Sequence, residues 1–112
     1  MHAAAAALTA LSITVSASGG EASSHWTLRC APAGGTLPHV AAACSRLLAL
    51  ADPFAPTPKG MACTDLYGGP QTARVTGRFR GRPVWATFAR RNGCETARWN
   101  RVRFLFPISL AP

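Results

Sequence analysis

Hydrophobic and polar residues alternate along several stretches of the chain, and this pattern predicts β-strands. Two such stretches come first, at residues 11–16 (LSITVS) and 24–30 (SHWTLRC), separated by a Gly-rich connection. A third, at residues 72–80, puts Thr and Arg on one face and Ala, Val, Gly and Phe on the other. Gly81 marks a turn, so residues 83–89 (PVWATFA) are expected to return as the partner strand of a hairpin. The run RFLFPISL at residues 103–110 is expected to form a final strand.

A helical repeat replaces the alternation in the segment HVAAACSRLLALA at residues 39–51. Pro38 suits the first turn of a helix there, and Pro53 is expected to end it. Three prolines exclude a helix from residues 52–62, which we expect to form an ordered surface loop, whereas residues 90–102 are expected to form a loop and a short helix. The hydrophobic face of the first helix is expected to carry Val40, Ala43, Cys44, Leu47, Leu48 and Ala51.

These elements predict an α+β fold in which a five-stranded, mostly antiparallel sheet carries two helices on one side. The chain has 112 residues, 48% of them hydrophobic, and is expected to form one domain over residues 1–112. Residues 1–6 are expected to be disordered or the remnant of a longer N-terminus. The apolar N-terminal stretch has the length of a signal-peptide core, but only His2 resembles a basic flank, so we favour a strand and expect an export signal upstream. No stretch is long enough to span a membrane.

The four cysteines, Cys30, Cys44, Cys63 and Cys94, form an even set without a C-x-x-C pair. The three histidines show no ligand-like spacing to them, which argues against a zinc site. Two disulfides are therefore expected, and they indicate an oxidising compartment and a secreted protein. The sequence permits three pairings, of which the nearest-neighbour pairing would close loops of about 15 and 32 residues and stabilise the fold by about 3–4 kcal/mol each.

The chain is strongly basic, with eleven arginines, one lysine and a formal charge of +8. Such a charge raises nucleic acid or an anionic surface as a partner. The arginines between Arg74 and Arg103 form no recognised nucleic-acid motif, so we interpret them as a solvated face and expect no nucleic-acid partner. Likewise, Trp26, Trp85 and Trp99 are expected to pack in the core or at sheet edges rather than to stack on bases.

The residues needed for catalysis or cofactor binding form no recognised set. The four carboxylates make no acid–base pair, no nucleophile motif such as G-x-S-x-G surrounds Ser45 or Thr64, and no Gly-rich phosphate loop is present. Two disulfides would leave no thiol nucleophile. We therefore expect neither an enzyme nor a cofactor or metal site.

Regular structure does not account for one segment, GMACTDLYGGP at residues 60–70. It carries Cys63 near its start and Asp65, one of only four acidic residues, two positions later. An exposed loop held by a disulfide loses its conformational entropy on folding, so it resembles a preorganised peptide ligand for the cleft of another protein. The alternative is a surface connection with no role in binding.

Three spaced motifs resemble those of a known family. Cys30 begins C-x-P-x-G-G-T-x-P, Cys63 begins C-x-x-x-Y, and Val75 begins V-x-G-x-x-x-G-x-x-V. Together with LSITVS, AACSRLLAL and NGCE, they occur in the order seen in the Streptomyces subtilisin inhibitor family, which comprises secreted actinobacterial inhibitors of serine proteases. The resemblance implies the same sheet with two helices, and it pairs Cys30 with Cys44 and Cys63 with Cys94.

The resemblance, which covers approximately residues 7–95, also implies a reactive site in the loop after Cys63. By position, Asp65 would enter the primary specificity pocket of a protease, and Asp65–Leu66 would be the scissile bond. The remaining contacts of the reactive loop would come from Ala62, Cys63 and Thr64 on the acyl side and from Tyr67 beyond Leu66.

Asp65 is an unusual residue for that position. A subtilisin pocket favours large apolar side chains and a trypsin pocket carries an acid, so burying the Asp65 carboxylate in either costs several kcal/mol and removes orders of magnitude of affinity. The expected partner is an extracellular serine protease, either subtilisin-like or selective for acidic residues. The alternatives are a basic secreted binding module for an anionic polymer and a non-inhibitory family member that serves as a protease substrate or carrier. The resemblance also implies a homodimer through the sheet, where arginines at 74–80 would repel their copies.

Overall fold

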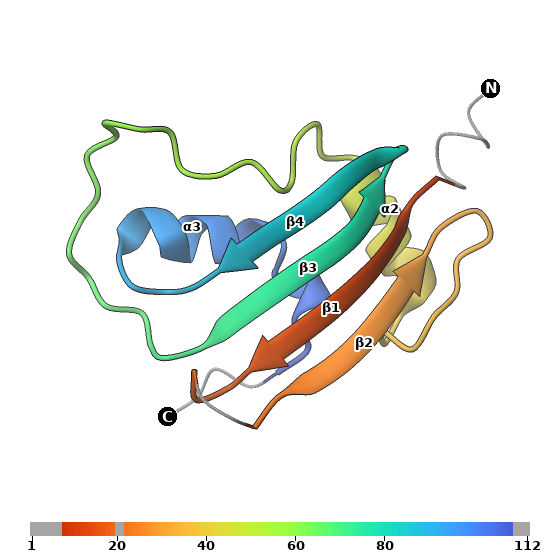
Figure 1. Cartoon of the computed structure of the whole chain (residues 1–112), viewed down its shortest axis with the longest axis horizontal. Helices are drawn as coiled ribbons and strands as arrows, with labels where there is room; N and C mark the ends of the chain where they lie inside the picture. Colours follow the sequence, from red (N-terminus) through yellow and green to blue (C-terminus); the bar gives the residue numbers. More distant parts are fainter. Residues whose placement is uncertain (1–7, 20–21, 109–112) are drawn as a thin grey trace.

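The computed structural model describes residues 8–19 and 22–108, and within them the chain forms one antiparallel sheet of four strands with two α-helices. The strands, in the spatial order β2-β1-β3-β4, are β1 (Ala10–Ser16), β2 (Ser24–Arg29), β3 (Thr72–Phe79) and β4 (Arg82–Phe88). The helices are α2 (Val40–Leu48) and α3 (Gly93–Arg101), followed by the short 3-10 helix η1 (Arg103–Leu105). In Figure 1, α2 lies behind the sheet, and α3 lies beside the β4 edge and partly behind it, so neither helix covers the face that is turned to the viewer. The expected α+β class, both helices and the first four expected strands are confirmed.

The expected fifth strand is wrong for the residues that the structure describes. A 3-10 helix takes its place, closed by bonds of 2.9 Å from Leu105 N–H to Val102 C=O and from Phe106 N–H to Arg103 C=O. Leu105 and Phe106 are both buried, whereas a strand would point successive side chains to opposite faces. Residues 109–110 of the expected strand, and residues 1–6, lie outside the described residues.

The first helix is shorter than expected. It ends at Leu48, so Ala51 is exposed beyond the helix instead of lying on its buried face, and Pro53 is buried in the connection that follows. The Arg80 guanidinium donates a hydrogen bond to the C=O of Leu48. This bond satisfies one of the carbonyls that every helix leaves free at its C-terminal end, and a tertiary contact therefore helps to fix where α2 stops.

The hydrophobic core lies between the sheet and the helices. Ile13, Val75 and Ala86 are neighbours on three adjacent strands, and all three are buried. From the helix side, Leu47 of α2 and Trp99 of α3 are also buried. One continuous cluster therefore joins both helices to the sheet.

The other face of the sheet, here named the open face, is left uncovered by the helices of the described chain (Figure 1). Arg80 was expected on its polar side but lies with Gly81 in the two-residue turn between β3 and β4, where both have positive φ (52° and 81°). Trp85 was expected to pack, yet it is 71% exposed on this face. The open face consists of alternate residues of the four strands, namely Ala10, Ser12, Thr14, Ser16, His25, Thr27, Arg29, Thr72, Arg74, Thr76, Arg78, Pro83, Trp85 and Thr87.

Candidate functional site

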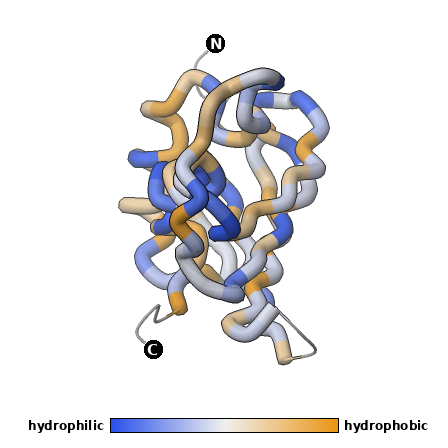
Figure 2. Tube along the Cα trace, turned by 90° about the vertical axis from the view of Figure 1, so that its left-hand side faces the viewer, coloured by the Kyte–Doolittle hydropathy of each residue, from blue (hydrophilic) through white to orange (hydrophobic). Residues whose placement is uncertain are grey.

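Residues 60–70, here named the Cys63 loop, contain no helix or strand. Figure 1 shows them in the long connection that leaves α2, passes around the N-terminal end of α3 and enters β3. Figure 2 views the molecule from this side, where hydrophobic and hydrophilic residues are interspersed along the chain. Met61, Leu66 and Tyr67 are 54%, 75% and 68% exposed. Several large hydrophobic side chains exposed in one loop are typical of a contact surface for another molecule.

Both disulfides implied by the resemblance are present. Cys30–Cys44 joins the end of β2 to α2, with Cα atoms 5.7 Å apart. Cys63–Cys94 joins the Cys63 loop to the first turn of α3, with Cα atoms 5.3 Å apart. Because α3 also carries the buried Trp99, the second disulfide connects the exposed loop to the core.

A backbone hydrogen bond holds the loop next to this disulfide. The N–H of Gly93 donates to the C=O of Thr64 at 3.0 Å. The two chains approach so closely here that a Cβ atom on Gly93 would lie 2.2 Å from Thr64 Oγ1. These contacts therefore hold Thr64, the residue that precedes Asp65. Glycine at position 93 leaves room for this close approach.

A second anchor holds the loop beyond Tyr67. The N–H of Gly68 donates to the backbone C=O of Arg90 at 2.6 Å, and the Nε–H of Arg90 donates to the C=O of Gly68 at 3.1 Å. Arg90 is itself held, since its Nη1–H donates to Asn100 Oδ1 at 3.5 Å and its guanidinium carbon lies 5.7 Å from the centre of the Trp99 ring. Gly68 is thus bonded to a side chain that packs on the core.

Asp65, Leu66 and Tyr67 lie between the two anchors and are all exposed. Their flanking residues are both bonded to one short segment, residues 90–94, which leads into α3. The loop therefore exposes three consecutive side chains, while the residues on either side of them, Thr64 and Gly68, are both bonded to residues 90–94. This arrangement limits how far the two halves could separate if the backbone between them were cut.

Polar contacts around the start of α3 hold residues 90–94 in place. Asn92 Oδ1 caps the helix by accepting a bond from Glu95 N–H at 3.0 Å. The Glu95 carboxylate accepts from Thr57 Oγ1 at 2.7 Å and pairs with Arg98 at 3.1 Å. Arg98 Nε–H donates to Ala55 C=O at 3.0 Å. These bonds attach the chain that precedes the Cys63 loop to the same helix.

The structure brings the six predicted reactive-loop residues, 62–67, together on one exposed segment. Sequence reasoning missed Arg90, Gly93 and Asn92, which hold that segment from outside it. A partial signal was available, because the expected Cys63–Cys94 bond would bring the residues just before Cys94 to the loop.

Other kinds of site find little support in the part of the chain that the structure describes. Across residues 8–19 and 22–108, no three His, Cys, Asp or Glu side chains gather as they would around a metal ion. The helices within the same residues are too short or too polar to cross a membrane.

Comparison with known proteins identifies the family. Residues 5–92 match the subtilisin inhibitor-like family, whose proteins are protease inhibitors and not enzymes. Among solved structures, the chain is similar to Streptomyces caespitosus sermetstatin in its crystal structure with Bacillus licheniformis subtilisin. The two share 28% sequence identity with a TM-score of 0.56, over 88% of this chain and 97% of that one. No curated protein matches the chain. Because the family match spans most of the sequence, the chain belongs to the subtilisin inhibitor-like family.

Proposed function

We propose that the chain inhibits a serine protease through the Cys63 loop, with Asp65 in the primary specificity pocket and Asp65–Leu66 as the scissile bond. One observation carries the proposal, namely that Thr64 and Gly68, on the two sides of this bond, are both hydrogen-bonded to residues 90–94. The exposed residues between them would bind along the cleft of the protease as an extended substrate does, largely through backbone hydrogen bonds.

The anchors also explain how a substrate-like loop would inhibit. The protease serine attacks the carbonyl carbon of Asp65, the carbonyl oxygen enters the oxyanion hole, and Leu66 leaves as a free amine. With an ordinary peptide, that amine diffuses away and water completes the hydrolysis. Here Gly68 remains bonded to Arg90 and Cys63 to Cys94, so the amine stays near the acyl carbon at a high effective concentration. The peptide bond forms again faster than water enters, and the protease stays occupied.

The side chain of Asp65 selects the class of protease. An apolar pocket would bury its carboxylate without a partner, and a pocket that carries an acid would repel it. A pocket lined by basic side chains or by hydroxyl and amide donors would instead pair with it. We therefore propose an acid-selective serine protease as the preferred target and a subtilisin-like protease as a weaker one.

The same proposal places the protein outside the cell. Its two disulfides persist in an oxidising compartment, which is also where an extracellular protease would meet it. A homodimer through the open face is also proposed; its two-fold contact would join the same surface of both chains without requiring Arg74 or Arg78 to meet its own copy, because residue i of one chain contacts residue j of the other. The Cys63 loop lies away from that face, so each chain of a dimer would carry its own reactive site (Figure 1).

The proposal is tested with oxidised protein against acid-selective, subtilisin-like and trypsin-like serine proteases. Inhibition constants are measured, and mass spectrometry follows cleavage between Asp65 and Leu66. We expect the acid-selective enzyme to be inhibited most tightly. Asp65→Leu should shift the preference toward the subtilisin-like enzyme by about a hundredfold or more, since its apolar pocket would no longer have to bury an unpaired carboxylate. Asp52→Leu is the matched control, because it removes an exposed carboxylate outside the loop.

Two outcomes would contradict the proposal. If Asp52→Leu and Asp65→Leu changed inhibition equally, the effect would come from net charge and not from a pocket. If no protease were inhibited and the bond were cut to completion or left intact, the chain would be a non-inhibitory family member, such as a protease substrate or a carrier.

A further inference from the structure

The connection between α2 and β3 presents a second exposed segment at the start of the Cys63 loop. Residues 58–61 (Pro-Lys-Gly-Met), here named the Lys59 turn, are all exposed and belong to no helix or strand. Lys59 is the single lysine of the chain and the only basic residue between Leu48 and Thr72. This long connection, which Figure 1 shows passing around α3, therefore carries its positive charge at one point.

Lys59 and Gly60 are the two central residues of the turn. The N–H of Met61 donates to the C=O of Pro58 at 3.3 Å, and Gly60 has a φ of 81°, the value that the third residue of a type II turn adopts. No atom lies within 4 Å of the position that a Cβ atom on Gly60 would take. Because the closing bond is long, opening the turn into the extended form that a protease cleft accepts breaks one weak hydrogen bond.

A cut in this turn would leave the fold assembled. It would divide the chain into residues 1–59, which contain β1, β2 and α2, and residues 60–112, which contain β3, β4 and α3. β1 pairs with β3 along its whole length, and each half keeps its own disulfide. Thr57 Oγ1, just before the turn, also stays bonded to the Glu95 carboxylate of the other half at 2.7 Å. The two halves would therefore remain associated through the sheet.

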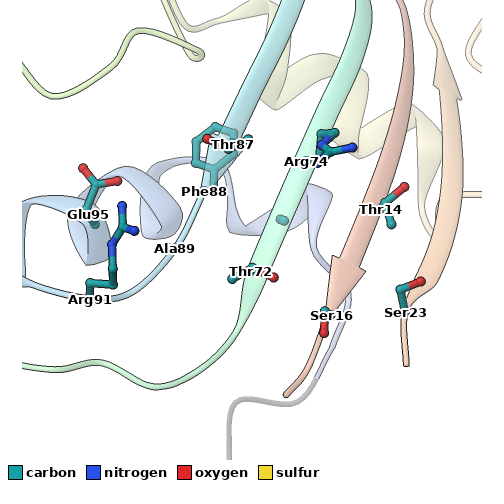
Figure 3. A pocket seen from close by; sticks show the side chains of 11 residues that line it. Thr14, Ser16, Ser23, Thr72, Arg74, Thr87, Phe88, Ala89, Arg91 and Glu95 are labelled. Carbon is teal, nitrogen blue, oxygen red and sulfur yellow. The ribbon is translucent and has the colours of Figure 1, made fainter. Parts of the chain in front are cut away.

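The arginines of the chain are less open to a protease cleft, which binds its substrate in extended form. Most of them lie within paired strands or helices. Arg80 lies in the tight turn between two paired strands, where opening would disrupt the sheet. Arg90 is bonded to the Cys63 loop, and the side chain of Arg91 lies beside Glu95 at the edge of a hollow (Figure 3). Lys59 is therefore the basic residue best placed for recognition by a protease.

From these observations we infer that Lys59–Gly60 is a cleavage site for a trypsin-like protease. The pocket of such a protease carries an acid, which repels Asp65 but pairs with the ammonium group of Lys59. The protease serine attacks the carbonyl carbon of Lys59, the amine of Gly60 leaves, and water releases the acyl group. One water thus adds across the C–N bond, giving a carboxylate on Lys59 and an amine on Gly60. Because the next anchor, Cys63, lies three residues beyond the cut, the amine moves away and hydrolysis goes to completion.

The cut acts on the Cys63 loop from its acyl side. Residues 60–62 become a free end, which must be ordered again when a target protease binds along the loop. Thr64 and Gly68 keep their hydrogen bonds to residues 90–94. A trypsin-like protease would therefore weaken the binding of the inhibitor to its acid-selective target without releasing the leaving half of the proposed scissile bond. This effect rests on the proposed function, whereas the cut itself does not.

The inference is tested by brief incubation of the oxidised protein with trypsin, followed by mass spectrometry under denaturing conditions. We expect fragments 1–59 and 60–112 to appear first, and size-exclusion chromatography without denaturant to keep them together. Lys59→Gln should slow their appearance at least about tenfold through the lost ion pair in the pocket, and Lys59→Arg should restore it. Arg103→Gln is the matched control, because it removes a positive charge from an exposed residue of η1 and should leave the cut unchanged.

Inhibition of an acid-selective protease is then compared before and after the cut. We expect the cut protein to bind about tenfold more weakly, whereas Lys59→Gln treated with trypsin in the same way should bind as before. A first cut elsewhere, or a folded chain left intact under conditions that degrade the reduced chain, would overturn the inference. Unchanged inhibition by fully cut protein would overturn the inferred effect on the Cys63 loop. If no protease is inhibited at the outset, the proposed function fails, while the position of the first cut still decides the inference.

Discussion

Arg90 connects the most exposed part of the molecule to its core. Its Nε–H bonds to Gly68 on one side, and its guanidinium lies over the ring of buried Trp99 on the other. A guanidinium that stacks on an aromatic ring keeps its planar set of donors in a fixed direction. In the proposed mechanism, Arg90 would therefore position the leaving side of the Asp65–Leu66 bond, and the Cys63–Cys94 disulfide would position the acyl side.

Replacing Arg90 with Ala tests this role, since it removes the side-chain anchor of Gly68 but leaves the backbone bond between the two residues. We expect the cut chain to accumulate about tenfold faster with the target protease, while initial binding changes less, because the loss acts on the amine after cleavage. Mass spectrometry over time measures the cut fraction. Arg91→Ala loses the same charge at an exposed neighbouring residue and serves as the control. Equal cleavage rates for the two variants would show that Arg90 does not retain the leaving half.

Elements with one buried face and one solvent-exposed face were predictable from the sequence. In β1, Ile13 and Val15 are buried while Ser12 and Thr14 are only partly so, as the alternation predicts. The 3-10 helix η1 was not predictable, because Phe106 next to it is buried by contact with Phe88, 5.3 Å away between ring centres and distant in sequence. The local pattern of hydrophobic residues does not indicate a contact between residues so far apart in the sequence.

The candidate site also has a part that was predictable from the sequence and a part that was not. Cys63 and its spacing to Tyr67 located the loop and its exposed residues from the sequence. The anchor at Arg90 depends on a contact with Gly68, which lies 22 residues earlier in the chain. No sequence motif links these two residues, so the contact could not be predicted from the sequence. The loop was therefore predictable as a segment, whereas the contacts that hold it required the folded structure.

The two disulfides serve different elements, and paired substitutions separate their roles. Replacing both Cys63 and Cys94 by Ser, or both Cys30 and Cys44, should lower the free energy of unfolding by about 3–4 kcal/mol in each case, since each bond closes a loop in the unfolded chain. Only the first pair should turn the inhibitor into a substrate that is cut to completion. Denaturant unfolding measures stability, and the inhibition assay, run well below the unfolding temperature, measures function. Loss of inhibition in both double variants, at equal stability, would contradict a special role of the loop disulfide.

At the scale of the whole molecule, the two candidate contact surfaces are separate. The Cys63 loop passes around the N-terminal end of α3, while the open face is the uncovered side of the sheet (Figure 1). The chain's charge of +8 is concentrated in arginines, and in the described residues the one ion pair joins Arg98 to Glu95 beside α3. The arginines of the open face therefore form no ion pair within the described residues, and their charge would act on whatever approaches this face.

Salt tests whether the open face joins two copies of the chain. The arginines of two such faces repel each other, and added salt screens that repulsion and promotes self-association. We expect a dimer in sedimentation experiments whose dissociation constant falls at least about tenfold between about 20 mM and about 500 mM salt. Arg74→Gln should reduce this salt dependence, while Arg103→Gln, at an exposed residue of η1, should leave it nearly unchanged. A monomer throughout this range, or a dimer that Trp85→Ala does not weaken, would contradict a contact through the open face.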